Sequence, residues 1–219
     1  MTQLRGALLT MAVILAALLA IAVFVVAAPR EDALKAIEDR ADAMARRQAL
    51  RTLAATGTMA DVPRIAQALR DPDRGVRMLA EAALWEVWSR SGDKEIDRLF
   101  ATGVQEMSEG RWDEAVTTFT TIIARKPEFA EGWNKRATVY FLMGDYTKSL
   151  ADCDEVMKRN PFHYGALSGY AMIYGKLHQP MRALEFYEQA LGVNPNLDGV
   201  RDAIEILRDE LIRQRRESI

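Results

Sequence analysis

The stretch DYTKSLADCDEVMKRNP, residues 145–161, decides the fold of this chain together with two related stretches on either side of it. Pro161 closes the stretch, and Pro127 and Pro195 lie at equal distances before and after it. The same spacing recurs in a small, a mostly bulky and an aliphatic column: Ala115, Ser149 and Ala183; Phe119, Cys153 and Tyr187; Ile122, Val156 and Ala190. A fixed period of roughly 20 to 50 residues indicates a repeat architecture. We therefore expect three stacked copies of one structural unit.

A period of about 34 residues with this pattern resembles the tetratricopeptide repeat family. The middle copy matches the family best, with Trp133, Ala137 and Tyr140 in its first half and the quoted stretch in its second. The first copy matches least, because Leu99 and Glu106 replace the usual aromatic residues. The resemblance implies an all-α, right-handed solenoid of three helical hairpins, assigned to residues 96–129, 130–163 and 164–197.

The ends of the predicted helices follow from backbone chemistry. Proline disfavours a helical residue before it, so we expect Lys126, Asn160 and Asn194 each to end a helix. Gly110 and Gly144 mark the turns inside the first two hairpins, and His178 holds this position in the third.

The last hairpin needs a partner for its exposed apolar face. Residues 198–219 are assigned to a capping helix and tail, since Val200, Ile204, Leu207 and Leu211 recur at helical spacing. These residues complete the predicted solenoid.

Residues 31–92 form a second predicted helical module. The run Asp71-Pro72-Asp73 followed by Val76 and Arg77 resembles the turn and second helix of a HEAT-like repeat. The resemblance implies an α-hairpin module in which Asp73 caps the second helix. A generic helical hairpin is the alternative interpretation.

Residues 1–28 form a hydrophobic leader. From Ala7 to Ala28 there is no charged residue, and about 22 helical residues span a bilayer's hydrocarbon core. One interpretation is a signal anchor, with a transmembrane helix over 7–28. The other is a cleaved signal peptide, because Val26-Ala27-Ala28 resembles a cleavage site. Both predict export across the inner membrane, with the repeats in the periplasm.

Composition offers little support for an enzyme or a nucleic-acid-binding protein. The 219 residues carry a formal charge of −2 and one cysteine, so neither a basic field nor an intrachain disulfide is expected. His163 and His178 have no metal-ligand spacing with other candidate ligands, and we expect no metal and no cofactor. The run Asp152 to Glu155 is interpreted as a solvated acidic face with Cys153 turned inward. An enzyme remains only a remote alternative.

The family resemblance places a binding groove along the first helix of each unit. It implies a protein or peptide partner. The charge balance predicts no nucleic-acid partner, and membrane contact is expected only through residues 7–28 if the leader is not cleaved. The groove-lining residues carried over are Phe100, Val104, Met107, Glu131, Asn134, Thr138, Phe141, Ser168, Met172 and Lys176. Some family members clamp a terminal carboxylate with lysine, asparagine and arginine, but Phe100, Val104 and Gly169 occupy clamp columns here.

The expected groove is therefore partly apolar, and the chain is interpreted as a scaffold or adaptor of the cell envelope. Two alternatives stay open. Phe100 and Met107 pack on the preceding module and leave little groove, or the chain is a structural subunit that contacts its partners through the solenoid ends.

Overall fold

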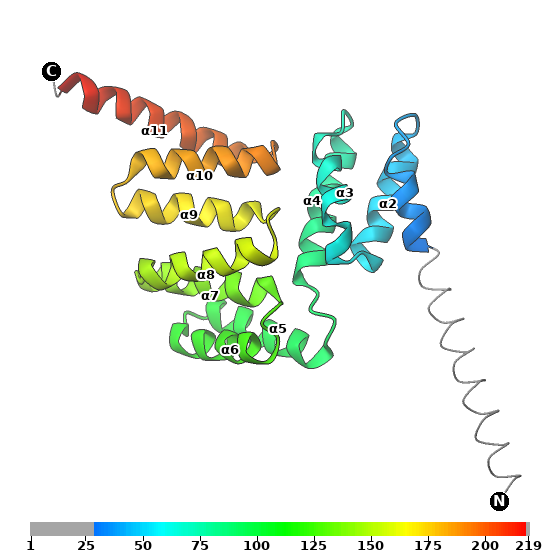
Figure 1. Ribbon diagram of the computed structural model, residues 1–219, viewed down its shortest axis with the longest axis horizontal. Coiled ribbons are helices and arrows are strands. Elements are labelled where there is room, and N and C mark those ends of the chain that lie inside the picture. Colours follow the sequence, from blue (N-terminus) through cyan, green and yellow to red (C-terminus); the bar gives the residue numbers. More distant parts are fainter. Residues whose placement is uncertain (1–28, 218–219) are drawn as a thin grey trace, which may run out of the picture. The chain divides into compact units, whose positions relative to one another are not determined.

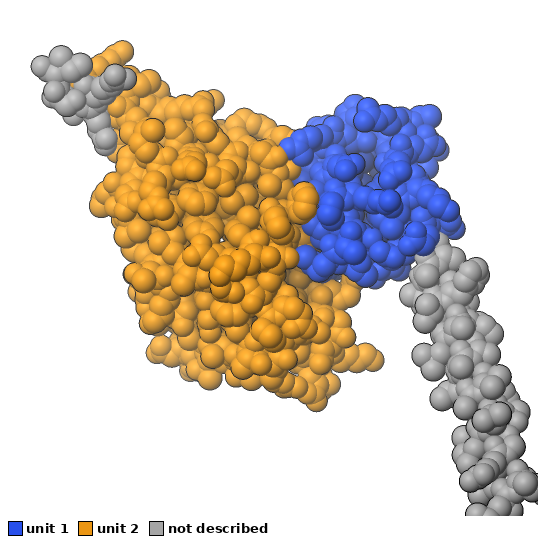
Figure 2. Space-filling model, in the orientation of Figure 1, with its two compact units in different colours: residues 1–87 blue, residues 88–219 orange. Residues whose placement is uncertain are grey.

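The computed structural model describes residues 29–217. These residues form helices joined by turns and loops, and they contain no strand (Figure 1). The all-α fold expected from the repeat pattern is confirmed. The chain divides into two compact units, residues 1–87 and residues 88–219 (Figure 2). The boundary falls near the end of the helix that precedes the first predicted repeat, and each unit is described by itself below.

Unit 1 begins with a helical segment over 29–36 and continues with α2 (Ala43–Thr56), which Asp42 caps by accepting from two backbone N–H groups. Two single turns of 3₁₀-helix flank the short α3, and α4 closes the unit. Their bounds are Met59–Asp61 for η1, Val62–Gln67 for α3, Ala68–Arg70 for η2 and Arg74–Ser89 for α4. Asp73 caps α4 as expected, because its carboxylate accepts from the backbone N–H of Val76 at 2.8 Å. The HEAT-like nature of residues 31–92 stays a prediction.

Paired arginine and aspartate side chains connect the elements of unit 1. Arg46 and Arg47 on α2 each hold an aspartate in the turn before α4 with two hydrogen bonds, Asp71 and Asp73 respectively. The Arg46–Asp71 pair is almost fully buried. Two parallel N–H···O bonds fix direction as well as distance, so these pairs orient the turn on α2.

Unit 2 contains three helical hairpins and a final helix. The hairpins pair α5 with α6, α7 with α8, and α9 with α10 (Figure 1). Their bounds are Lys94–Ser108, Trp112–Arg125, Ala130–Met143, Tyr146–Arg159, Tyr164–Lys176 and Pro180–Val193 in chain order, and α11 covers Asp198–Glu217. Helix α11 packs on α10, the position expected of a capping helix.

The helix ends of unit 2 agree with the sequence predictions. Lys126, Asn160 and Asn194 are the C-cap residues of α6, α8 and α10, directly before the three prolines. Gly144 ends α7 with a φ of 80°, a left-handed conformation that glycine adopts without steric cost. His178, at the same position of the next hairpin, takes a φ of 56° without that freedom.

The columns of the repeat pack as their side-chain sizes predict. A Cβ atom added to Gly103 on α5 would lie 2.7 Å from the ring of Phe119 on α6, so only glycine allows this approach. In the second hairpin the hydroxyl of Ser149 donates to the backbone carbonyl of Ala137 at 2.7 Å. These contacts hold the two helices of a hairpin close together.

No helix within residues 29–217 combines the length and the apolar character that a membrane crossing requires. The predicted span over 7–28 lies outside the described residues. The signal anchor and the signal peptide therefore both stay predictions.

Candidate peptide-binding groove

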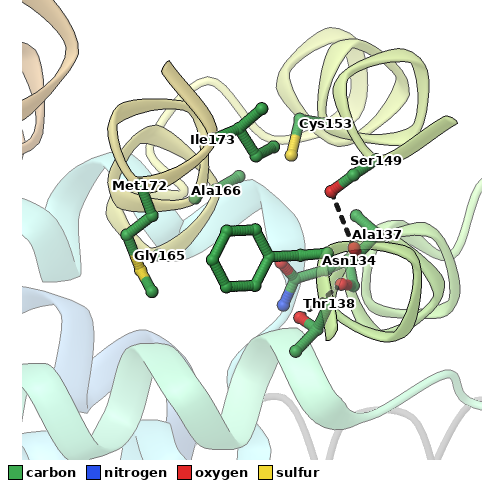
Figure 3. A pocket seen from close by; sticks show the side chains of 11 residues that line it. Asn134, Ala137, Thr138, Ser149, Cys153, Gly165, Ala166, Met172 and Ile173 are labelled. Atoms are coloured by element: carbon green, nitrogen blue, oxygen red, sulfur yellow. Dashed lines mark hydrogen bonds between the residues drawn. The ribbon is translucent and has the colours of Figure 1, made fainter. Parts of the chain in front are cut away.

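The first pocket of the candidate groove lies between the second and third hairpins. It has a volume of about 140 Å³ and is lined mainly by apolar groups. Figure 3 shows Asn134, Ala137 and Thr138 reaching it from α7, Ser149 and Cys153 from α8, and Gly165, Ala166, Met172 and Ile173 from α9. Phe141 and Gly169 complete the lining. The pocket is large enough for part of one bulky apolar side chain.

The second pocket lies farther toward the C-terminal end of unit 2 and has a volume of about 400 Å³. Its lining comes from α9, α10 and α11, together with Phe141 of α7. Phe141 and Met172 border both pockets, so the two are adjacent. We call this pair of pockets the α7–α11 slot. Met172 is 47% exposed and Ile206 is 64% exposed, so the slot presents apolar surface to solvent.

The polar groups at the first pocket are bonded to the protein. Asn134 donates from Nδ2 to a carboxylate oxygen of Glu131 at 3.0 Å. Thr138 donates its hydroxyl hydrogen to the backbone carbonyl of Asn134 at 2.9 Å, and Ser149 donates to Ala137. These bonds fix the direction in which each polar group faces the pocket.

A fully buried pair stands behind Asn134. Nε2 of His163 lies 2.6 Å from Oε1 of Glu131, and neither side chain is exposed. Nδ1 of His163 accepts from the backbone N–H of Ala166 at 2.9 Å and so caps α9. Because Nδ1 accepts, the proton of the neutral ring sits on Nε2 and is donated to Glu131.

The pKa of Glu131 reflects two opposed effects. Burial raises it, but the hydrogen bond from His163, the charge of Lys135 and the hydrogen bond from Asn134 hold it below the ordinary carboxyl value. Glu131 is therefore a buried carboxylate at neutral pH.

Cys153 forms part of the pocket wall and is almost fully buried, as expected. Burial, followed by the nearby charges of Asp152 and Asp154, raises its pKa to about 12, so the thiol stays protonated at neutral pH. The interpretation of its neighbours as a solvated acidic face is wrong for Asp152. That carboxylate is buried and accepts two hydrogen bonds of 2.8 Å from Arg136 on α7.

The structure brings five of the ten predicted groove residues together along the α7–α11 slot: Asn134, Thr138, Phe141, Met172 and Lys176. Glu131 differs from the prediction, because its carboxylate is turned inward to His163 and cannot reach a partner. Phe100 and Met107 pack against the core of their own hairpin, in the cluster around Ile96 and Phe119. Val104 is 39% exposed on α5, and Ser168 donates to the carbonyl of Tyr164; neither lines either pocket.

The sequence interpretation missed the contribution of α11 to the slot. Ala203, Ile206 and Leu207 line the second pocket. The repeat register contained a signal for Ile206, because Val104, Thr138, Met172 and Ile206 are evenly spaced. The capping helix therefore continues the groove column of the hairpins.

The described residues contain no group of three or more histidine, cysteine, aspartate or glutamate side chains arranged to hold a metal ion. The polar side chains of the slot are an amide, hydroxyls, a protonated thiol and a lysine, which suit hydrogen bonding. The arrangement can therefore seat an apolar ligand and bond to its polar groups.

A family model described as tetratricopeptide repeat matches residues 130–163 and 164–197. A TPR repeat-containing protein of Rhizobium etli is 34% identical over 146 residues, which cover 67% of this chain and 71% of the relative. The chain therefore belongs to the tetratricopeptide repeat family. The outer membrane protein assembly factor BamD of Caulobacter vibrioides is 24% identical over 126 residues, covering 55% of this chain and 38% of that protein.

Solved structures show the same fold over a little more than half of the chain. The Sgt2 TPR domain of Aspergillus fumigatus aligns with a TM-score of 0.53 and 20% identity, covering 57% of this chain and 83% of that domain. The first TPR of Spaghetti (RPAP3), solved with the HSP90 peptide SRMEEVD, aligns with a TM-score of 0.52 and 21% identity. That alignment covers 54% of this chain and 94% of the domain.

Proposed function

We propose that this protein is a non-enzymatic scaffold or adaptor that binds a partner protein or peptide through the α7–α11 slot. The observation that carries the proposal is the pair of adjacent, mainly apolar pockets that share Phe141 and Met172 in their linings. Exposed apolar surface of this kind is typical of protein interaction sites. The RPAP3 domain, a fold relative, was solved with a bound peptide, which supports the same use of the fold here.

We also propose that the protein acts in the cell envelope, exported and either anchored by residues 7–28 or released by cleavage of the leader. The apolar run of the leader and the similarity to the assembly factor BamD support this placement. An intact mass measured on the protein extracted from membranes shows whether the leader is retained or cleaved. A chain that begins at Met1 supports the anchor, and a chain that begins at or near Pro29 supports cleavage.

Two exposed methionines on neighbouring helices provide a matched test of the slot. Met172 lines it from α9, whereas Met181 on α10 is 64% exposed and lines neither pocket. A photo-crosslinking amino acid at position 172 should capture the partner in cells, and the same amino acid at 181 should not. The replacement Met172→Asp should abolish copurification of that partner, while Met181→Asp should leave it unchanged.

A structural subunit that contacts partners through the ends of the repeat array is the second candidate. The exposed side chain of Ile212, 51% exposed near the end of α11, favours it. A crosslink to the partner from position 212, with none from position 172, would support this candidate and reject binding in the slot.

A further inference from the structure

The two ends of the α7–α11 slot have opposite hydrogen-bonding polarity. At the first pocket the hydroxyl hydrogens of Thr138 and Ser149 are already donated to backbone carbonyls. A hydroxyl oxygen that has donated its hydrogen keeps only lone pairs for another group. Both hydroxyls can therefore only accept a hydrogen bond from an occupant.

Asn134 strengthens this polarity. A carboxylate only accepts, so the Asn134 atom that faces Glu131 must be the amide nitrogen, and the amide oxygen is left as an acceptor. The buried negative charge of Glu131 lies next to the Asn134 amide, 3.0 Å from its nitrogen. Lys135 lies 3.8 Å from that carboxylate but lines neither pocket. The remaining donors at this end are the second amide hydrogen of Asn134 and the weakly donating thiol of Cys153.

The second pocket has the opposite character. Lys176, an exposed residue at the end of α9, is one of its lining residues, and its ammonium group only donates. The surrounding residues are mainly apolar, among them Ile206 and Leu207. An occupant that spans the slot therefore meets acceptors at the first pocket and a cation at the second.

An α-helix matches this arrangement better than an extended strand. The first turn of a helix presents unpaired N–H groups and the last turn presents unpaired carbonyls, whereas a strand alternates donors and acceptors along its length. The helix dipole has the same sense, positive at its N-terminus and negative at its C-terminus. A helix with an apolar face fits the apolar lining of the slot.

We propose that the slot is directional and holds an apolar-faced helix of a partner protein. The helix N-terminal turn, or an amino group there, lies at Asn134 and Thr138, and its C-terminal turn or an acidic side chain lies at Lys176. A carboxylate is disfavoured in the first pocket, because most of the polar atoms there present lone pairs and the buried charge of Glu131 lies nearby. This inference rests on the proposed function and specifies the chemistry of the partner.

Two small probes with the same apolar body and opposite head groups test the polarity: 4-phenylbutylammonium and 4-phenylbutyrate. Binding to the full chain is followed by the methyl NMR signals of Thr138 at the first pocket and Ile206 at the second. The ammonium probe should shift Thr138 more than Ile206, and the carboxylate probe should do the reverse. A carboxylate probe that shifts Thr138 as strongly as the ammonium probe overturns the proposed direction but leaves binding in the slot intact. If neither probe shifts either signal, the slot is not a binding site and the proposed function fails with it.

The variant Thr138→Val removes one acceptor, and binding is then followed at the methyl of Met172. We expect the affinity for the ammonium probe to fall about fivefold, the effect of one hydrogen bond, while carboxylate binding is unchanged. Thr121→Val is the matched control, since Thr121 makes the same bond to the carbonyl four residues earlier and lines neither pocket. Equal losses for both variants would contradict the role of Thr138.

The helix itself is tested with a synthetic amphipathic peptide of leucine, alanine and glutamate that carries a nitroxide at one end. An N-terminal nitroxide should broaden the Thr138 methyl signal more than that of Ile206, and a C-terminal nitroxide should do the reverse. The opposite pattern, or equal broadening from both ends, overturns the direction.

Discussion

Nε2 of His163 lies 2.6 Å from Oε1 of Glu131, and this buried contact joins the N-cap of α9 to the first turn of α7. The two helices belong to successive repeats and line the same slot. Because the imidazole also caps α9 through Nδ1, one side chain fixes both the start of that helix and its distance from α7. Apolar clusters pack within and between the second and third hairpins, and this polar pair adds a directional contact between them.

Glu131→Gln should lower the free energy of unfolding by about 2 kcal/mol at pH 7, the usual effect of losing a hydrogen bond to a charged group. The pKa of Glu131 is lower in the folded protein than in the unfolded chain. The unfolded state therefore binds more protons, and the contribution is full above the unfolded pKa. It disappears as the pH falls through the folded pKa. Urea unfolding of the parent chain and of Glu131→Gln, at several pH values between 7 and 3, measures how this stability difference changes with pH.

Glu128→Gln is the control for that experiment, because Glu128 is exposed and lies 3.5 Å from Lys126. It should change the unfolding free energy by less than about 0.5 kcal/mol at every pH. A Glu131→Gln effect that is equally large at acid and neutral pH would show that shape, and not charge, stabilises the pair.

Gly103→Ala should destabilise the protein by about 1–2 kcal/mol, because its new methyl group would meet the ring of Phe119. Gly175→Ala is the matched change, since a Cβ atom at Gly175 on α9 meets nothing within 4 Å. That variant should be stabilised by up to about 1 kcal/mol through helix propensity alone. Thermal unfolding separates the two, and a stabilised Gly103→Ala variant would contradict the close approach of α5 and α6.

His178→Gly should stabilise the third hairpin by about 1 kcal/mol, because a left-handed backbone is unfavourable for a residue with a side chain. The reverse change, Gly144→Ala, places a side chain in the same conformation at the equivalent turn and should cost a similar amount. Urea unfolding gives both values. Equal stability of His178→Gly and the parent chain would mean that interactions of the imidazole offset the backbone cost.

Arg136→Lys should cost about 1–2 kcal/mol although it keeps the charge, because hydrogen bonds to a buried carboxylate are lost. Arg136 forms two bonds with Asp152, donates to the hydroxyl of Thr120 and lies over the ring of Trp133. A lysine cannot reproduce this planar arrangement.

Arg208→Lys is the control for Arg136→Lys, since Arg208 forms an exposed pair with Glu188 and its replacement should change little. Denaturant unfolding of both variants gives the comparison. Equal losses of unfolding free energy at positions 136 and 208 would show that the hydrogen bonds between Arg136 and Asp152 contribute no more to stability than an exposed ion pair.

Hydrophobic and small-residue columns made the repeat fold predictable from the sequence. Positions such as those of Gly103 and Ser149 recur in every hairpin because each hairpin must solve the same packing problem. The three prolines likewise fixed the helix ends, since their effect on the backbone is local.

The polar interior was not predictable in the same way. Glu131 and His163 lie at the start and the end of the second repeat, and the pair does not recur. Asp97 and Gly165 occupy the column of Glu131, and Phe129 and Leu197 occupy that of His163. Periodicity says which face of a helix a residue lies on but not whether a charged group there finds a buried partner. The bond of Asp152 to Arg136 was missed for the same reason.

The reactivity of Cys153 can report whether a ligand occupies the slot. It is the single cysteine of the sequence, and its thiol forms part of the wall of the first pocket. With a pKa of about 12, it reacts slowly with alkylating reagents at neutral pH, because the thiolate is the reactive form. A molecule seated against that wall would slow the reaction further. The rate at which one native sulfur is modified therefore becomes a direct measure of how much of the slot is filled, without any engineered label.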